Sequence, residues 1–149
     1  MISVVFPGQG SQKVGMGSDL YNQYDYIKKM FQEADDILGY GITDLILNGP
    51  QEKLNQTTFT QPAIYLIGCT ICEVLKKETD FFQKKFNFFA GHSLGEYSAI
   101  VCAESLDFKD ALYLLHERGK AMQDAVSVGR GSMIAVLNLN ISEIKQILH

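Results

Sequence analysis

A serine flanked by glycines, between an apolar segment and a helical one, is the feature that most constrains the fold. Residues 91–95 have the pattern G-x-S-x-G around Ser93, after an apolar run at 85–90 and before a helical pattern at 94–103. Side chains at the two glycine positions would collide with the flanking strand and helix, so the spacing suits a very tight turn. Such a turn exposes the serine hydroxyl at a helix N-terminus. The pattern therefore predicts a reactive Ser93, and its alternative is an ordinary serine N-cap.

Length and composition limit the class of protein. The chain has 149 residues, of which 46% are hydrophobic and 20% charged, and its formal net charge is −4. These values are typical of one globular domain with its own core. Acidic and basic residues are interspersed, so we expect no nucleic-acid partner. We expect no membrane partner either, because the longest apolar stretch, Ala63–Leu75, is too short for a span and contains Glu73, and the strand-like start predicts no signal peptide.

The cysteines favour a structural role over a metal or redox role. Cys69 and Cys72 form a C-x-x-C pair, but it lies within a helical pattern and has no second pair. We therefore expect buried core thiols, with no metal site and no cofactor. Unpaired thiols also favour a reducing, cytoplasmic location.

Hydrophobic periodicity predicts an α/β fold. Thr60 is expected to cap a long buried helix, with Pro62 in its first turn, and Asp107 to cap a later helix. The inner face of that later helix is expected to hold Ala111, Leu112, Leu115, Gly119 and Met122. The expected strands are 2–6, 85–90 and 132–137, and the expected helices are 22–38, 42–47, 51–56, 60–78, 94–103, 107–125 and 142–149.

A glycine-rich loop follows the first expected strand. It does not match a dinucleotide fingerprint, because position 13 is Lys13 where that pattern needs glycine, and it lacks the Gly-Lys-Ser/Thr of a P-loop. Glycines let backbone N–H groups approach a bound molecule closely. The loop is therefore interpreted either as a tight turn or as part of a substrate site.

The number of strands is small for a finished parallel sheet. Three strands are predicted, and the last lies near residue 149. A parallel sheet normally has more strands and is covered on both faces. The pattern is typical of the first part of a larger α/β enzyme.

Four motifs occur in order along the chain and together carry a family resemblance. They are FPGQGSQ at 6–12, TQPA at 60–63, GHSLGEY at 91–97 and RGKAMQ at 118–123. They closely resemble malonyl-CoA:acyl-carrier-protein transacylase and the acyltransferase domains of polyketide synthases. The resemblance covers essentially the whole chain and is far more specific than the serine pattern alone.

The resemblance implies an α/β-hydrolase-like large subdomain with a small ferredoxin-like subdomain inserted into it. Residues 1–127 would form the N-terminal part of the large subdomain, and residues 128–149 the beginning of the small one. In that family the chain later returns to complete the large subdomain and brings a catalytic histidine. These 149 residues do not include that return, so the chain alone is expected to be a poor catalyst.

The resemblance also implies a reaction with malonyl-CoA and acyl carrier protein as partners, in fatty acid synthesis. Ser93 would attack the thioester, and the carrier's pantetheine thiol would attack the malonyl-serine ester. Backbone N–H groups of Gln9 and Leu94 would stabilise the oxyanion. Arg118, which by itself would be interpreted as a solvated helix charge, would bind the malonyl carboxylate through its planar fork.

Other polar residues are assigned supporting roles by the same resemblance. Gln61 would line the site, although a role at a helix start is an equal alternative. His92 adjoins the nucleophile on a tight turn, so its ring is expected to point away from the Ser93 hydroxyl and to order the turn. His116 and His149 are the other candidate bases, and none of the three histidines matches the family's base.

Two other functions remain open at this point. A serine esterase or thioesterase shares the serine turn, but the glycine-rich loop and Arg118 speak against it. An inactive fragment or carrier-binding scaffold would agree with the missing base and the small sheet.

Overall fold

The chain folds into a mixed α/β structure in which helices predominate. The computed structural model describes residues 2–83, 88–126 and 136–148. The elements are β1 (Ser3–Phe6), α1 (Ser18–Gln23), α2 (Asp25–Leu38), α3 (Ile42–Asn48), α4 (Gln51–Leu54), α5 (Thr57–Glu78), the 3₁₀ turn η1 (Phe81–Gln83), β2 (Phe88–Gly91), α6 (Gly95–Cys102), α7 (Phe108–Ala125) and α8 (Ile141–Ile147). The α/β class predicted from the sequence is therefore confirmed.

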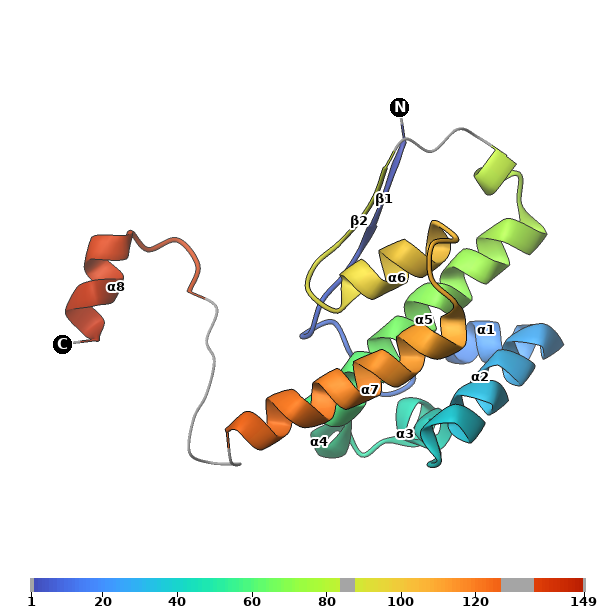
Figure 1. Cartoon of the computed structure of the whole chain (residues 1–149), viewed down its shortest axis with the longest axis horizontal. Coiled ribbons are helices and arrows are strands. Elements are labelled where there is room, and N and C mark those ends of the chain that lie inside the picture. The colour runs from blue at the N-terminus through green and yellow to red at the C-terminus, as the bar shows by residue number, and fades with distance from the viewer. Residues whose placement is uncertain (1, 84–87, 127–135, 149) are drawn as a thin grey trace.

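Two parallel strands form the sheet within the described residues. β1 pairs with β2 so that Phe6 lies opposite Gly91, and the N–H of His92 extends the pairing by donating to the carbonyl of Phe6 at 3.1 Å. The glycine-rich loop after β1 therefore lies beside the turn after β2. α6 packs against both strands, and α5 and α7 follow beyond α6 (Figure 1).

The long helix α5 lies at the centre of the core. Every residue from 60 to 66 is buried, which confirms that this helix is enclosed on most of its faces. By length and composition α5 could also cross a membrane, and 56% of the stretch tested is buried inside the protein. A core helix meets the same criteria, so this finding is weak evidence for a span.

The predicted start of α5 is wrong. The helix begins at Thr57 after Gln56, so Pro62 lies inside the helix and not in its first turn. The Thr60 hydroxyl does not cap the helix but donates to the carbonyls of Leu54 (2.5 Å) and Gln56 (3.0 Å). A threonine can bond back to the preceding turn in this way, so its presence did not mark a helix start.

The helix expected at 22–38 is divided in two. Tyr24 adopts an extended backbone (φ −123°, ψ 120°), which separates α1 from α2. The buried face of α2 consists of Ile27, Phe31, Ala34 and Leu38. The break has no glycine or proline to mark it in the sequence.

Helix α7 crosses the start of α5 at close range. Its predicted cap is confirmed, since the Asp107 side chain accepts a hydrogen bond from the N–H of Lys109 at 2.8 Å. Four of the five predicted inner residues are buried, whereas Met122 is 40% exposed. A Cβ on Gly119 would lie 2.9 Å from the carbonyl oxygen of Thr57, so glycine at this position permits the approach of the two helices.

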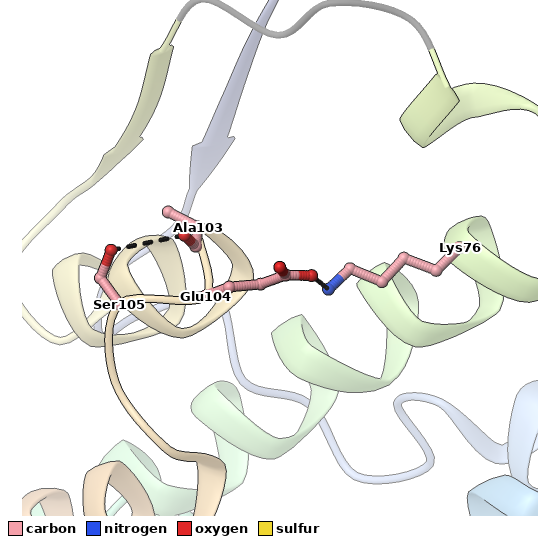
Figure 2. Close-up of polar contacts among 4 residues, drawn as sticks. All are labelled: Lys76, Ala103, Glu104 and Ser105. Carbon is pink, nitrogen blue, oxygen red and sulfur yellow. Dashed lines mark hydrogen bonds and ion pairs between the residues drawn. The ribbon is translucent and has the colours of Figure 1, made fainter.

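Three thiols lie where α5 packs against α6. Cys69, Cys72 and Cys102 are free and at most 5% exposed, which confirms the prediction of buried core thiols. Beside them, Lys76 Nζ on α5 pairs with Glu104 Oε1 in the turn after α6 at 3.1 Å (Figure 2). The same turn contains a hydrogen bond from Ser105 Oγ to the carbonyl of Ala103 (Figure 2).

The structure tests only part of the prediction for the C-terminal segment, which was a strand at 132–137 and a helix at 142–149. Of the strand expected at 132–137, residues 132–135 lie outside the described part, and residues 136 and 137 are not in a strand. α8 begins at Ile141, one residue before its predicted start, and Asn140 and Glu143 form a capping box around that start. His149 also lies outside the described residues.

Candidate active site

The turn between β2 and α6 holds Ser93 in a left-handed backbone conformation, with φ 57°. Non-glycine residues adopt this conformation rarely, and strained residues of this kind cluster at functional sites. The flanking glycines are required by contact. A Cβ on Gly91 would overlap the backbone of Gly95, and a Cβ on Gly95 would lie 2.6 Å from the carbonyl oxygen of Phe6. Ser93 therefore lies on the tight strand-to-helix turn that its sequence pattern predicts.

Within the described residues, the backbone N–H groups of Gln9 and Leu94 donate to no acceptor of the protein. The side chain of Gln9 is occupied elsewhere, because its Nε2 donates to Thr57 Oγ1 at 3.2 Å. This contact ties the glycine-rich loop to the first residue of α5. The side chain of Leu94 is buried, so its packing fixes the position of the backbone N–H that follows the serine.

Arg118 reaches the serine from α7. Its Nη2 donates to Ser93 Oγ at 3.0 Å, and its Nη1 donates to Gln61 Oε1 at 2.6 Å. Gln61 lies on α5 and is 1% exposed, and its Nε2 donates to Met122 Sδ at 3.2 Å. The structure thus brings together three residues that are up to 57 positions apart.

Two of the three histidines lie in the described part of the chain, and they contact different residues. The His92 ring lies against Gly8, where a Cβ would meet the ring, so it packs on the glycine-rich loop. His116 lies on α7 with its Nδ1 3.4 Å from the Tyr40 hydroxyl, and burial lowers the pKa of its imidazole. His149 is outside the described residues. Within the described part, the side-chain hydrogen bond of Ser93 Oγ is made with Arg118 and not with a histidine.

Two partners of the site were not identified from the sequence. Thr57 holds the Gln9 side chain, and Met122 holds the Gln61 amide, although Met122 was expected only on the buried face of its helix. No sequence signal distinguishes either residue, because each acts through a contact between segments that are far apart. The described residues contain no group of three or more side chains suited to a metal ion.

A profile of the family described as "Acyl transferase domain" matches residues 4–149. This chain belongs to that acyl transferase family. The "Malonyl CoA-acyl carrier protein transacylase" of Haemophilus influenzae is 49% identical over 138 residues, which are 93% of this chain and 44% of that protein. The chain therefore spans less than half the length of this acyl transferase.

Solved acyl transferase structures agree with the fold. An acyl-carrier-protein-S-malonyltransferase from Bartonella henselae superposes with a TM-score of 0.88 at 40% identity, covering 99% of this chain and 47% of that one. A type II polyketide synthase malonyl-transacylase, solved in complex with its acyl-carrier protein, gives a TM-score of 0.77 at 46% identity. That match covers 84% of this chain and 40% of the transacylase.

Proposed function

We propose that this chain forms the nucleophile-bearing part of an acyltransferase that moves a malonyl group from coenzyme A to the pantetheine thiol of acyl carrier protein. One observation carries the proposal: Arg118 Nη2 lies 3.0 Å from Ser93 Oγ. A reactive serine supports many acyl transfers, but a guanidinium beside it suits an acyl group that has a carboxylate of its own. The relatives named as malonyl transacylases support malonyl as that group.

The reaction proceeds in two steps through a malonyl-serine ester. In the first, Ser93 Oγ bonds to the thioester carbonyl carbon, the carbon–sulfur bond breaks, and the serine proton passes through a general base to the coenzyme A thiolate. In the second, the pantetheine sulfur bonds to the ester carbonyl carbon, the bond from that carbon to Ser93 Oγ breaks, and the thiol proton passes through the base to Ser93. The N–H groups of Gln9 and Leu94 stabilise the negative oxygen in both steps.

Arg118 selects the acyl group in this proposal. In a malonyl ester, one methylene separates the ester carbonyl from the free carboxylate, so the carboxylate stays close to the serine. A guanidinium that already contacts Ser93 Oγ is placed for such a short diacid. Its planar fork can bind both carboxylate oxygens at once. Gln61 supports Arg118 from the buried side.

The general base comes from outside the 149 residues in this proposal. His92 packs on Gly8 and His116 faces Tyr40, so neither is directed at Ser93 in the structure. We assign His92 a supporting role at the turn. The longer relatives contain additional residues that could supply a histidine, since this chain spans 44% of the H. influenzae protein.

The finer description of the fold is part of the proposal. Residues 1–127 form the N-terminal part of an α/β-hydrolase-like subdomain, and residues 128–149 begin a ferredoxin-like one. The parallel β1–β2 pair, the serine turn and α6 support the first assignment. The three free, buried thiols suit a reducing compartment, so we propose action in the cytoplasm, in fatty acid or polyketide synthesis.

The test uses the 149-residue chain and a chimera in which it is joined to the remainder of the H. influenzae relative. Each is incubated with malonyl-CoA, and the intact protein and the peptide containing Ser93 are weighed by mass spectrometry. In the chimera we expect one malonyl group on Ser93, no labelling after Ser93→Ala, and transfer to holo acyl carrier protein. Labelling that persists in Ser93→Ala would sink the assignment of the nucleophile.

The same experiment separates the alternative functions. Release of free malonate to water without transfer to the carrier thiol would indicate an esterase or thioesterase. A folded chimera that is never acylated would indicate a scaffold.

A further inference from the structure

The guanidinium of Arg118 is hydrogen-bonded on both arms. One arm donates to the amide oxygen of Gln61, and the other donates to the hydroxyl oxygen of Ser93. Both acceptors are neutral. A substrate carboxylate that binds Arg118 must therefore either share these N–H groups or replace one of the two acceptors.

The two acceptors differ in how firmly they are held. Gln61 is 1% exposed, lies on the central helix, and has its amide nitrogen engaged by Met122 Sδ. Releasing its oxygen would leave a buried polar atom without a partner, which is costly. Ser93 lies on an exposed turn, where water can replace the lost hydrogen bond. The serine is therefore the acceptor that gives way.

A carboxylate is also the stronger competitor. The Arg118–Ser93 hydrogen bond has one charged partner, whereas a guanidinium–carboxylate pair has two and can be bidentate, so a carboxylate oxygen displaces the hydroxyl oxygen from the guanidinium N–H. Gln61 meanwhile keeps Arg118 in position through the other arm. The exchange leaves the Ser93 hydroxyl without its hydrogen bond from Arg118 at the moment when an acyl group with a carboxylate is bound.

We propose that Arg118 restrains the Ser93 hydroxyl through this hydrogen bond, and that the substrate carboxylate releases the hydroxyl by taking over Nη2. The inference rests on the proposed function and adds a mechanism of selection at the same site. An acyl group without a carboxylate leaves Ser93 hydrogen-bonded to Arg118, with one oxygen lone pair engaged. Arg118 then selects the acyl group in two ways: it binds the carboxylate, and it frees the Ser93 hydroxyl to attack only when a carboxylate is bound.

The proposal has a thermodynamic consequence that requires no turnover. If Ser93 competes with the carboxylate for Arg118, removing the hydroxyl must strengthen carboxylate binding. The dissociation constant of malonate is measured by NMR titration for the chimera with the H. influenzae remainder and for its variants. We expect Ser93→Ala to bind malonate about two- to ten-fold more tightly, because the charged hydrogen bond between Arg118 and Ser93 is exposed and water already competes for it. Arg118→Ala should lose the binding.

Ser105→Ala is the matched control, because Ser105 hydrogen-bonds to Ala103 in a turn away from the site, and it should bind malonate as the parent chain does. Circular dichroism of each variant checks that it is folded. Unchanged or weaker binding in Ser93→Ala, with binding that still depends on Arg118, overturns this inference and leaves the proposed function intact. Absence of any Arg118-dependent malonate binding overturns both.

Discussion

The guanidinium of Arg118 lies 3.0 Å from the Ser93 hydroxyl, so its removal should affect acyl groups unequally. A hydrogen bond to a charged group contributes about 1.5–3 kcal/mol. We expect Arg118→Ala to lower the kcat/KM for malonyl transfer by roughly 10- to 150-fold and to lower acetyl transfer much less. The measurement compares both acyl-CoA substrates with the chimera described above.

Lys120→Ala is the control for this variant, because Lys120 is an exposed cation on the same helix that pairs with Glu117 at 3.2 Å. It should change neither substrate's kcat/KM. Equal losses for malonyl and acetyl transfer in Arg118→Ala would show that Arg118 is structural.

At the scale of residues, a local pattern predicted the tight turn at Ser93, because two glycines four positions apart have a steric purpose. The assignment of Ser93 as the nucleophile stays a prediction. Arg118 is proposed as a site residue only through the family resemblance, since an arginine on a helix is usually solvated. The contact between them could not be predicted, because it depends on how α7 crosses α5. Thr57 and Met122 were missed for the same reason.

At the scale of elements, the crossing of α5 and α7 sets the distance between Arg118 and the serine turn. Gly119→Ala would place a Cβ 2.9 Å from two backbone atoms, the oxygen of Thr57 and the Cα of Thr58. Backbone cannot give way cheaply, so we expect a loss of about 1–3 kcal/mol in the free energy of unfolding, measured with urea. The better helix propensity of alanine would offset about 1 kcal/mol of this cost.

Gly41→Ala is the matched control. Gly41 has φ −72°, and the nearest atom to an added Cβ is 3.9 Å away. We expect its free energy of unfolding to change by less than about 1 kcal/mol. If both variants unfold at the same urea concentration, the α5–α7 approach is looser than the structure indicates.

The contact of α5 with α6 should keep its thiols unreactive. Hydrogen bonding with Cys69 and burial raise the pKa of Cys102 to about 12, and hydrogen bonding with Cys102 and burial raise the pKa of Cys72 well above its ordinary value of 9.0. The thiolate is the nucleophile, so both cysteines should resist iodoacetamide at pH 8 and react in 8 M urea at about the rate of free cysteine. Mass spectrometry counts the alkyl groups.

The raised pKa values of Cys72 and Cys102 determine how the stability of the fold changes with pH. A pKa raised in the folded state means that folding favours the protonated thiol. The contribution of these thiols to the free energy of unfolding is complete below the unfolded pKa of 9.0 and is lost as the pH rises above it. Rapid alkylation of the native protein at pH 8 would contradict this account of the α5–α6 contact.

Elements with strong local signals could be predicted, and their ends less well. The cap at Asp107 and the enclosure of α5 follow from a capping side chain and from apolar residues on all faces. The break at Tyr24 has no local signal, since residues 22–25 contain no glycine or proline. Thr60 gave a false start because its hydroxyl bonds back to the preceding turn, which is a local cause.

At the scale of the whole molecule, apolar surface remains open between β1 and α5. A groove of about 260 Å³ is lined by residues of both elements, and Val5 (71%) and Ile71 (45%) are exposed. Exposed apolar patches and unpaired strand edges favour association. We expect the 149-residue chain to self-associate in sedimentation velocity and to unfold at lower urea than the chimera, with transferase activity near background.

The chimera is the control in that experiment, and it should be monomeric and active. A monomeric 149-residue chain that unfolds cooperatively and transfers malonyl at the chimera's rate would refute this prediction. In that case the base would have to be sought among His92, His116 and His149.

The proposed nucleophile Ser93 has a left-handed backbone conformation that glycine would adopt with less strain. A Cβ in this conformation costs roughly 1–2 kcal/mol, which glycine avoids. Ser93→Gly should therefore fold more stably than Ser93→Ala, which keeps the Cβ, and both should lack the nucleophile. Urea unfolding of the two variants measures the difference. A lineage released from selection for acyl transfer would gain stability by replacing this serine with glycine, so a retained serine records continued use.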